Sequence, residues 1–144
     1  MLGQKIIDYI ESQIVISSLM NDDMFTDSRK NFGYMVLTHE FMYRNLMKIR
    51  VEHICYFDGT GGSLRLTSLK RVLNTSIFSL SQSDEVSPVK LINNKYLKKL
   101  DYSVTGPSIK FLIDVEEDEK NVLEILKELY EINGNGVFGS EASF

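Results

Sequence analysis

The sequence predicts an α+β protein, with a mostly antiparallel sheet of about four strands and helices packed on one side of it. Apolar residues recur at helical spacing in three segments, and they alternate with polar residues in four others that form two consecutive pairs. The elements follow the order α-β-β-α-β-β-α, which is typical of a two-layer α+β fold. A chain of 144 residues, 43% of them hydrophobic, suits a single domain. We expect this domain to span residues 1–134, with residues 135–144 as a C-terminal tail.

The first helix is predicted over residues 2–20, where Leu2, Ile6, Ile10 and Ile14 recur every four residues. The polar residues 21–31 are expected to form a loop.

Residues 32–43 and 46–57 are predicted to form two strands that pair as a hairpin. The second strand has the clearer alternation, with Lys48, Arg50 and Glu52 on its polar face. Its apolar face comprises Met47, Ile49, Val51, Cys55 and Phe57.

A middle helix is predicted from Ser63 to Leu80, after the glycine-containing turn at residues 58–62. Its apolar stripe, at spacings of three and four residues, comprises Leu66, Leu69, Leu73, Ile77 and Leu80. Residues 81–88 are expected to be a surface loop.

A second hairpin is predicted from strands at residues 96–104 and 109–115, joined by the turn-forming pair Gly106-Pro107. The last helix begins at residues 116–119, where four carboxylates meet the positive end of the helix dipole. Its expected buried stripe comprises Val122, Ile125, Leu126 and Leu129.

Charge is sorted along the chain. Residues 29–100 carry twelve basic residues against five acids, whereas residues 101–144 carry three lysines against ten acids. A folded chain of this kind can present one basic and one acidic surface, and this suits head-to-tail assembly. The candidate subunit or partner interface therefore joins the basic Arg44, Lys48 and Arg50 to the acidic Glu124, Glu128 and Glu131.

The C-terminal tail contains Phe138 and Phe144, which are candidates for docking on the parent domain or on a neighbouring subunit. Disorder of the tail is the alternative interpretation.

Composition and motifs give little sign of catalysis. The turn at residues 58–63 matches neither phosphate-loop nor dinucleotide-binding spacing, and the two histidines lack a metal-binding signature. We expect no catalytic residues, no cofactor and no metal. The single Cys55 excludes an internal disulfide and is interpreted as a buried thiol. Without an apolar run of membrane-spanning length, and with a pI near 5.2, neither membrane insertion nor specific nucleic-acid binding is expected.

The order of elements resembles that of the tail-terminator, or tail-completion, proteins of tailed bacteriophages. The resemblance is carried by the helix at residues 2–16, the strand at 48–57, the helix at 63–80 and the hairpin at 96–115 that leads into a final helix. It implies a non-enzymatic protein that forms a ring, usually a hexamer, caps the tail tube and meets the head connector. Such a protein is assembled in the host cytoplasm and located in the virion.

Two other functions remain open. The acidic C-terminal helix could make the chain a small acidic binding protein, an immunity or antitoxin-like inhibitor that imitates nucleic acid toward a basic partner. An enzyme with an unrecognised site is the third interpretation. Outside a virion, the protein would be expected in the cytoplasm.

Overall fold

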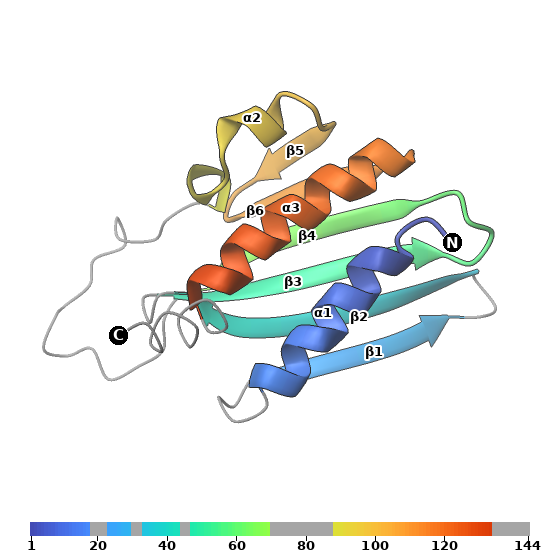
Figure 1. Cartoon of the computed structure of the whole chain (residues 1–144), viewed down its shortest axis with the longest axis horizontal. Coiled ribbons are helices and arrows are strands. Elements are labelled where there is room, and N and C mark those ends of the chain that lie inside the picture. The colour runs from blue at the N-terminus through green and yellow to red at the C-terminus, as the bar shows by residue number, and fades with distance from the viewer. Residues whose placement is uncertain (18–22, 30–32, 44–46, 70–87, 134–144) are drawn as a thin grey trace, which may run out of the picture.

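A computed structural model describes residues 1–17, 23–29, 33–43, 47–69 and 88–133 of the chain (Figure 1). The first part contains helix α1 (Gln4–Ser17) and strands β1 (Asp23–Arg29), β2 (Tyr34–Tyr43), β3 (Met47–Tyr56) and β4 (Gly62–Leu69). The second contains a 3₁₀ turn (Pro88–Leu91), the short helix α2 (Asn94–Leu97), strands β5 (Tyr102–Thr105) and β6 (Ser108–Ile113), and helix α3 (Glu116–Asn133).

The six strands form one antiparallel sheet in the order β1-β2-β3-β4-β6-β5. Strands β1 to β4 pair consecutively, as hairpins do. The last hairpin then joins β4 through its second strand, so that β5 lies at the edge of the sheet. This arrangement places β4 beside β6, two segments that are far apart in the sequence.

Helices α1 and α3 contact each other and lie across the same face of the sheet (Figure 1). Ile6 and Ile10 of α1, and Val122 and Leu126 of α3, are fully buried against that face. Short α2 joins this layer, because the Tyr96 hydroxyl donates to Glu128 of α3 over 2.9 Å. Within the described part of the chain, no α-helix covers the opposite face of the sheet, which we call the open face.

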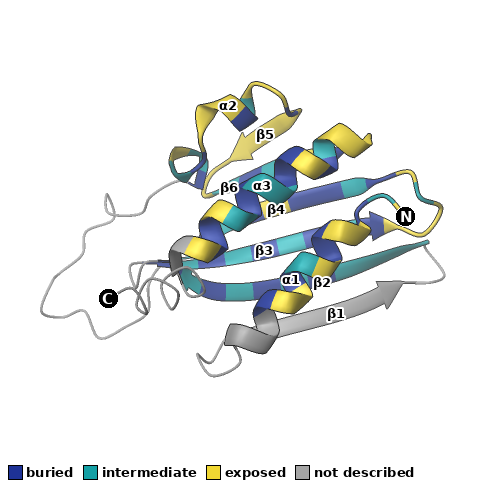
Figure 2. Ribbon diagram, in the orientation of Figure 1, coloured by how far each residue is buried: buried dark blue, intermediate teal, exposed yellow. Residues whose placement is uncertain are grey.

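Strand β3 shows how the sequence produces the two faces. Successive side chains of a strand point to opposite sides, and burial alternates residue by residue along β3 (Figure 2). Ile49, Val51 and Cys55 are buried beneath the helices, whereas Lys48 and Arg50 lie on the open face.

The start of α1 is attached to α3 by a buried carboxylate. Glu119, only 6% exposed, accepts hydrogen bonds from the backbone N–H of Gly3 at 2.7 Å and of Lys5 at 3.2 Å. These amides lie in the first turn of a helix and have no partner within it, so a carboxylate satisfies them and complements the helix dipole. In the same way, Asp118 accepts from the backbone N–H of Asp114 and Val115 at the start of α3.

The predicted α+β class is confirmed, and so are the strands β2, β3 and β6 and the two terminal helices. The stripe of α3 is buried as expected: Val122, Ile125, Leu126 and Leu129 are at most 3% exposed. Helices lie on one side of the sheet, as predicted, and a short helix still separates the two groups of strands.

Three local predictions are wrong. Residues 62–69 form strand β4 rather than the start of a helix at Ser63, and the remainder of that predicted helix, residues 70–80, lies outside the described residues. Residues 23–29 form strand β1 instead of a loop, so the sheet has six strands rather than about four. Residues 94–97 are helical, and the strand predicted at 96–104 is reduced to residues 102–105.

The predicted apolar face of β3 is wrong at one position. Phe57 lies beyond the end of the strand and is 43% exposed. Alternation cannot extend past the last paired residue, because the turn to β4 begins there.

Candidate anion-binding site on the open face of the sheet

Strands β4, β6 and β5 place two rows of polar residues on the open face. The strand register sets Arg65 opposite Lys110, and Lys110 opposite Ser103. Two residues further along the sheet, Thr67 lies opposite Ser108, and Ser108 opposite Thr105. One row therefore contains both cations and the other contains only hydroxyl groups.

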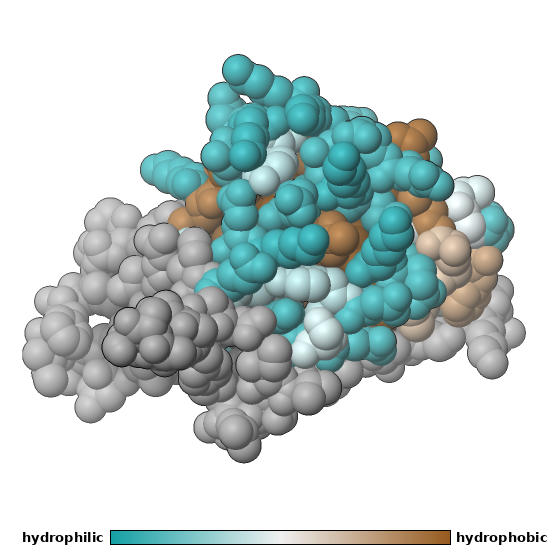
Figure 3. Space-filling view, viewed as in Figure 1, coloured by the Kyte–Doolittle hydropathy of each residue, from teal (hydrophilic) through white to brown (hydrophobic). Residues whose placement is uncertain are grey.

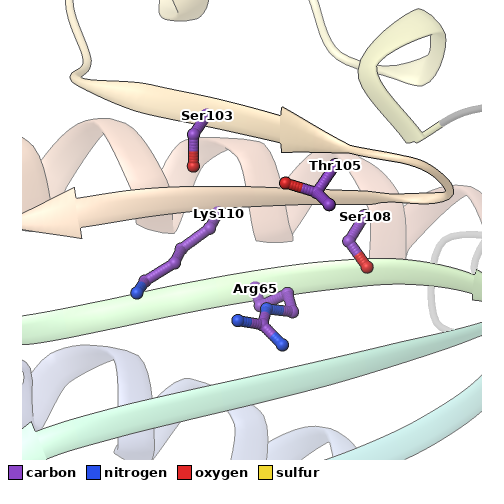
Figure 4. A pocket seen from close by; sticks show the side chains of 5 residues that line it. All are labelled: Arg65, Ser103, Thr105, Ser108 and Lys110. Carbon is purple, nitrogen blue, oxygen red and sulfur yellow. The ribbon is translucent and has the colours of Figure 1, made fainter.

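A hollow of about 160 Å³ lies over these rows and is lined by Arg65, Ser103, Thr105, Ser108 and Lys110 (Figure 4). Lys110 extends from β6 toward β4, and the Arg65 guanidinium lies at the edge of β4 that faces β3 (Figure 4). The hydroxyls of Ser103 and Thr105 come from β5, on the other side of β6. Among the described residues, no carboxylate lines the hollow.

The two cations oppose each other without a counterion in contact. Like charges directly opposite each other in a sheet are destabilising. Glu52 lies opposite Arg65 on the side away from the hollow, but no ion pair of the described residues includes Arg65 or Lys110. The positive charges of Arg65 and Lys110 are therefore available to bind an anion in the hollow.

The hydroxyl row is fixed in part by its own hydrogen bond. The Thr67 and Ser108 hydroxyls lie 2.8 Å apart, and either can donate to the other. Ser103 and Thr105 are exposed, so their hydroxyls can rotate toward a ligand.

The lining groups can bind an anion but contain no histidine or carboxylate that could act as a general base. A guanidinium offers a planar fork of N–H donors, an ammonium offers three donors, and hydroxyls add single donors. Together they suit an oxyanion. Activation of a nucleophile would require a base within hydrogen-bond distance of it, and none lines the hollow.

Lys48 and Arg50, two basic residues of the candidate interface, lie on the same open face but are already paired. Lys48 and Arg50 both contact Glu40 of β2, at 3.4 Å and 2.6 Å. Burial raises the pKa of Glu40, but the hydrogen bonds and charges of Arg50 and Lys48 outweigh that effect and leave the pKa below its usual value. Arg44 lies outside the described residues.

The acidic residues of the candidate interface lie on α3, in the helix layer. Glu124 pairs with Lys127 at 3.4 Å, Glu128 accepts from Tyr96, and Glu131 is exposed. Burial, followed by the hydrogen bond and charge of Glu128, raises the pKa of Tyr96 to about 12. The helix side of the molecule is mostly hydrophilic (Figure 3).

The structure thus brings Lys48 and Arg50 together, and it brings the three glutamates onto one helix. It places the two groups on opposite faces of the molecule, so they do not meet within one chain. Phe138 and Phe144 lie outside the described residues.

The histidines and the cysteine belong to the core. His39 and His53 are buried on the helix side of neighbouring strands, whereas Glu40 and Glu52 point to the open face. In the described ranges, no group of three or more potential ligands could hold a metal ion. The thiol of Cys55 donates to the backbone carbonyl of Leu2 over 3.3 Å, and burial raises its pKa.

Sequence reasoning missed Arg65 and Lys110 as a pair. Lys110 is on a strand that was predicted, but Arg65 was assigned to a helix. The available signal was the alternation of Leu64, Leu66 and Ser68, which are buried, with polar residues between them. Even with β4 recognised, its pairing with β6 is a long-range contact that no local pattern specifies.

Comparison of the chain with protein-family models, with curated proteins and with solved structures finds no match. None of the helices in the described ranges has the length and apolar character needed to cross a membrane.

Proposed function

We propose that this protein is a non-enzymatic assembly protein, in which the basic open face of one copy binds the acidic helix layer of the next. The observation that carries the proposal is the separation of charge between two opposite faces. On strands β2, β3, β4 and β6, the open face holds Lys48, Arg50, Arg65 and Lys110 against Glu40 and Glu52. Helix α3 holds seven carboxylates against two lysines.

The open face also has an apolar part, as a protein interface requires. The register aligns Val36, Ile54, Ser63 and Leu112 in one row across four strands, with Leu112 36% exposed. Beside this row, Tyr56 is 42% exposed and its ring packs against that of Tyr34 at 6.3 Å. Apolar side chains flanked by charged ones are the usual composition of a non-obligate interface.

Opposite charges on opposite faces favour a head-to-tail contact between identical copies. Such a contact is heterologous, and it generates a ring when the rotation between copies closes. A ring agrees with the function expected from the resemblance to phage tail terminators, namely capping of a tail tube and attachment to a head connector in the virion. The proposal needs no catalytic group.

Native mass spectrometry at micromolar concentration tests this function. We expect an oligomer at low salt that dissociates as salt increases, because surface charges are screened over about 10 Å at 0.1 M salt. The double variant E124K/E131K should be monomeric. Glu128 is left unchanged because it accepts the Tyr96 hydrogen bond.

The matched variant reverses the other face, with R65E/K110E. It too should be monomeric, and an equimolar mixture of the two variants should contain mixed dimers, since each retains one native face. If the wild-type chain is monomeric at both salt concentrations, the proposed assembly is wrong.

The second candidate is the small acidic binding protein, and the observation that favours it is the excess of carboxylates on α3. It requires a monomer that binds a basic partner through this helix. Substitution of Glu124, Glu128 and Glu131 by Gln should then abolish partner binding, while the free protein remains a monomer. Unchanged affinity of that triple variant would exclude the acidic helix as the binding surface.

A further inference from the structure

The hollow between β4, β6 and β5 is lined by hydrogen-bond donors from three strands. Arg65 and Lys110 supply two positive charges from neighbouring strands, and Ser103, Thr105 and Ser108 supply hydroxyls from two rows. These groups come from three strands of the sheet, which are more rigid than a loop. The backbone that carries these donors is therefore held in place by the pairing of the strands.

We propose that this hollow binds a single phosphate group, either free phosphate or a phosphate monoester on a small molecule. Phosphate oxygens accept charge-assisted hydrogen bonds from a guanidinium fork and from an ammonium, and the remaining oxygens accept from hydroxyls. A carboxylate has two oxygens and would leave part of this donor set unused. The described lining residues include two cations and no carboxylate, and this fits a ligand with more than one negative charge.

The size of the hollow limits the ligand. A volume of about 160 Å³ is below the range of roughly 300–1,000 Å³ that holds drug-sized molecules. One phosphate group can enter, but a nucleoside or a sugar attached to it must lie outside, over the open face. The site therefore recognises the phosphate and not the rest of the molecule.

Electrostatics supplies the reason for binding. Arg65 and Lys110 face each other across one pair of strands with no carboxylate in ion-pair contact, so a doubly charged anion between them removes a repulsion that the free protein retains. Ligand binding to the folded state also raises the melting temperature. Lys48 and Arg50 lack this capacity, because Glu40 already neutralises them in part.

The proposal does not depend on self-association, because every donor comes from one chain. The variant E124K/E131K, which is designed to prevent assembly, leaves the hollow unchanged and should bind phosphate as the wild type does. A failure of assembly and a failure of phosphate binding are therefore separable. If both hold, phosphate and the acidic helix of a neighbouring copy compete for the same face.

The test is a titration of ¹⁵N-labelled protein with sodium phosphate at pH 7, followed by NMR at constant ionic strength. We expect saturable shifts of the amide signals of residues 65, 67, 103–105 and 108–110. R65Q and K110Q should each weaken binding about tenfold or more, as expected when a charged partner is removed. R65K should bind more weakly than wild type but better than R65Q, because it keeps the charge and loses the fork.

The matched control is K120Q, which removes an exposed lysine from α3 on the opposite side of the molecule. It should bind phosphate with unchanged affinity. Glycerol 2-phosphate separates the two sources of the ligand: binding equal to that of phosphate indicates a monoester, and much weaker binding indicates the free ion.

Several results would overturn the proposal. Shifts that sodium chloride reproduces would show general screening. Shifts centred on the lysines near α2, or an equal loss of binding in K120Q and K110Q, would place the anion elsewhere. Circular dichroism confirms that each variant is folded before its affinity is compared.

Discussion

Two glycines in the turn between β3 and β4 have similar backbones but different surroundings. Gly61 has φ of +111°, and a Cβ built there would lie 1.8 Å from the backbone oxygen of Ile113 on β6. Gly59 has φ of +82°, and a Cβ there meets nothing within 4 Å. Alanine substitution at the two positions therefore separates backbone strain from a steric clash.

The magnitudes follow from these contacts. Alanine at Gly59 adds only the left-handed backbone penalty, about 1–2 kcal/mol. Alanine at Gly61 adds a comparable strain, and the 1.8 Å approach must open beyond 3.0 Å by moving the turn away from β6. That movement breaks the hydrogen bond from the Tyr56 N–H to the Gly61 carbonyl, 2.9 Å long and contributing about 1 kcal/mol. For Gly61→Ala, the strain and the lost hydrogen bond total at least about 2–3 kcal/mol, a large fraction of the stability of a typical domain.

Urea unfolding followed by circular dichroism measures both losses against the wild type. We expect Gly61→Ala to lower the free energy of unfolding by at least about 1 kcal/mol more than Gly59→Ala does. Equal losses, within about 0.5 kcal/mol, would refute the close packing of this turn against β6. Phosphate affinity should change little in either variant that remains folded, because Arg65 and Lys110 are not in the turn.

Three further predictions use the same unfolding measurement. Glu119→Ala should lower the free energy of unfolding by about 2–4 kcal/mol, because it leaves two backbone amides at the start of α1 without an acceptor. A decrease of less than about 1 kcal/mol would contradict that role. Burial lowers the pKa of His53 below its usual 6.5, so at pH values below 6.5 the unfolded chain binds more protons than the folded chain does. The free energy of unfolding therefore decreases as the pH is lowered through this range. Between pH 7.5 and 5.5, His53→Gln should show a smaller decrease than the wild type. Glu40→Gln should lower the free energy of unfolding by only about 0.5–1.5 kcal/mol, because the contacts of Glu40 with Lys48 and Arg50 are partly exposed. High salt should reduce this difference in unfolding free energy between the variant and the wild type.

Local patterns predicted the elements whose burial follows a regular period. The stripe of α3 and the alternation of β3 each place one face against the core, and both faces are buried as expected. Strand β4 has two compatible periods, because Leu66 and Leu69 fit a helix as well as Leu64 and Leu66 fit a strand. The segment forms a strand because it pairs with β3 and β6. A short window of sequence around β4 does not include these partners.

Strand β1 shows a second limit. Its residues, Asp23 to Arg29, are mostly polar, and they form a strand because they pair with β2 at the edge of the sheet. The candidate site was partly predictable for a related reason. Lys48 and Arg50 alternate visibly on one strand, whereas the Arg65–Lys110 pair arises only when two distant segments become neighbours.

The hydrogen bond between Gly3 and Glu119 joins residues 116 positions apart in the chain. A ribosome releases the first helix long before it makes the carboxylate that completes the start of that helix. Strand β4 can pair with β3 at once, but one of its edges stays unpaired until β6 has been synthesised. The emerging chain therefore holds an incomplete core, with apolar strand surface unprotected, until α3 has left the exit tunnel. Loss of that helix would remove the closing step of folding as well as a layer of the structure, and it should yield an aggregating chain rather than a smaller domain.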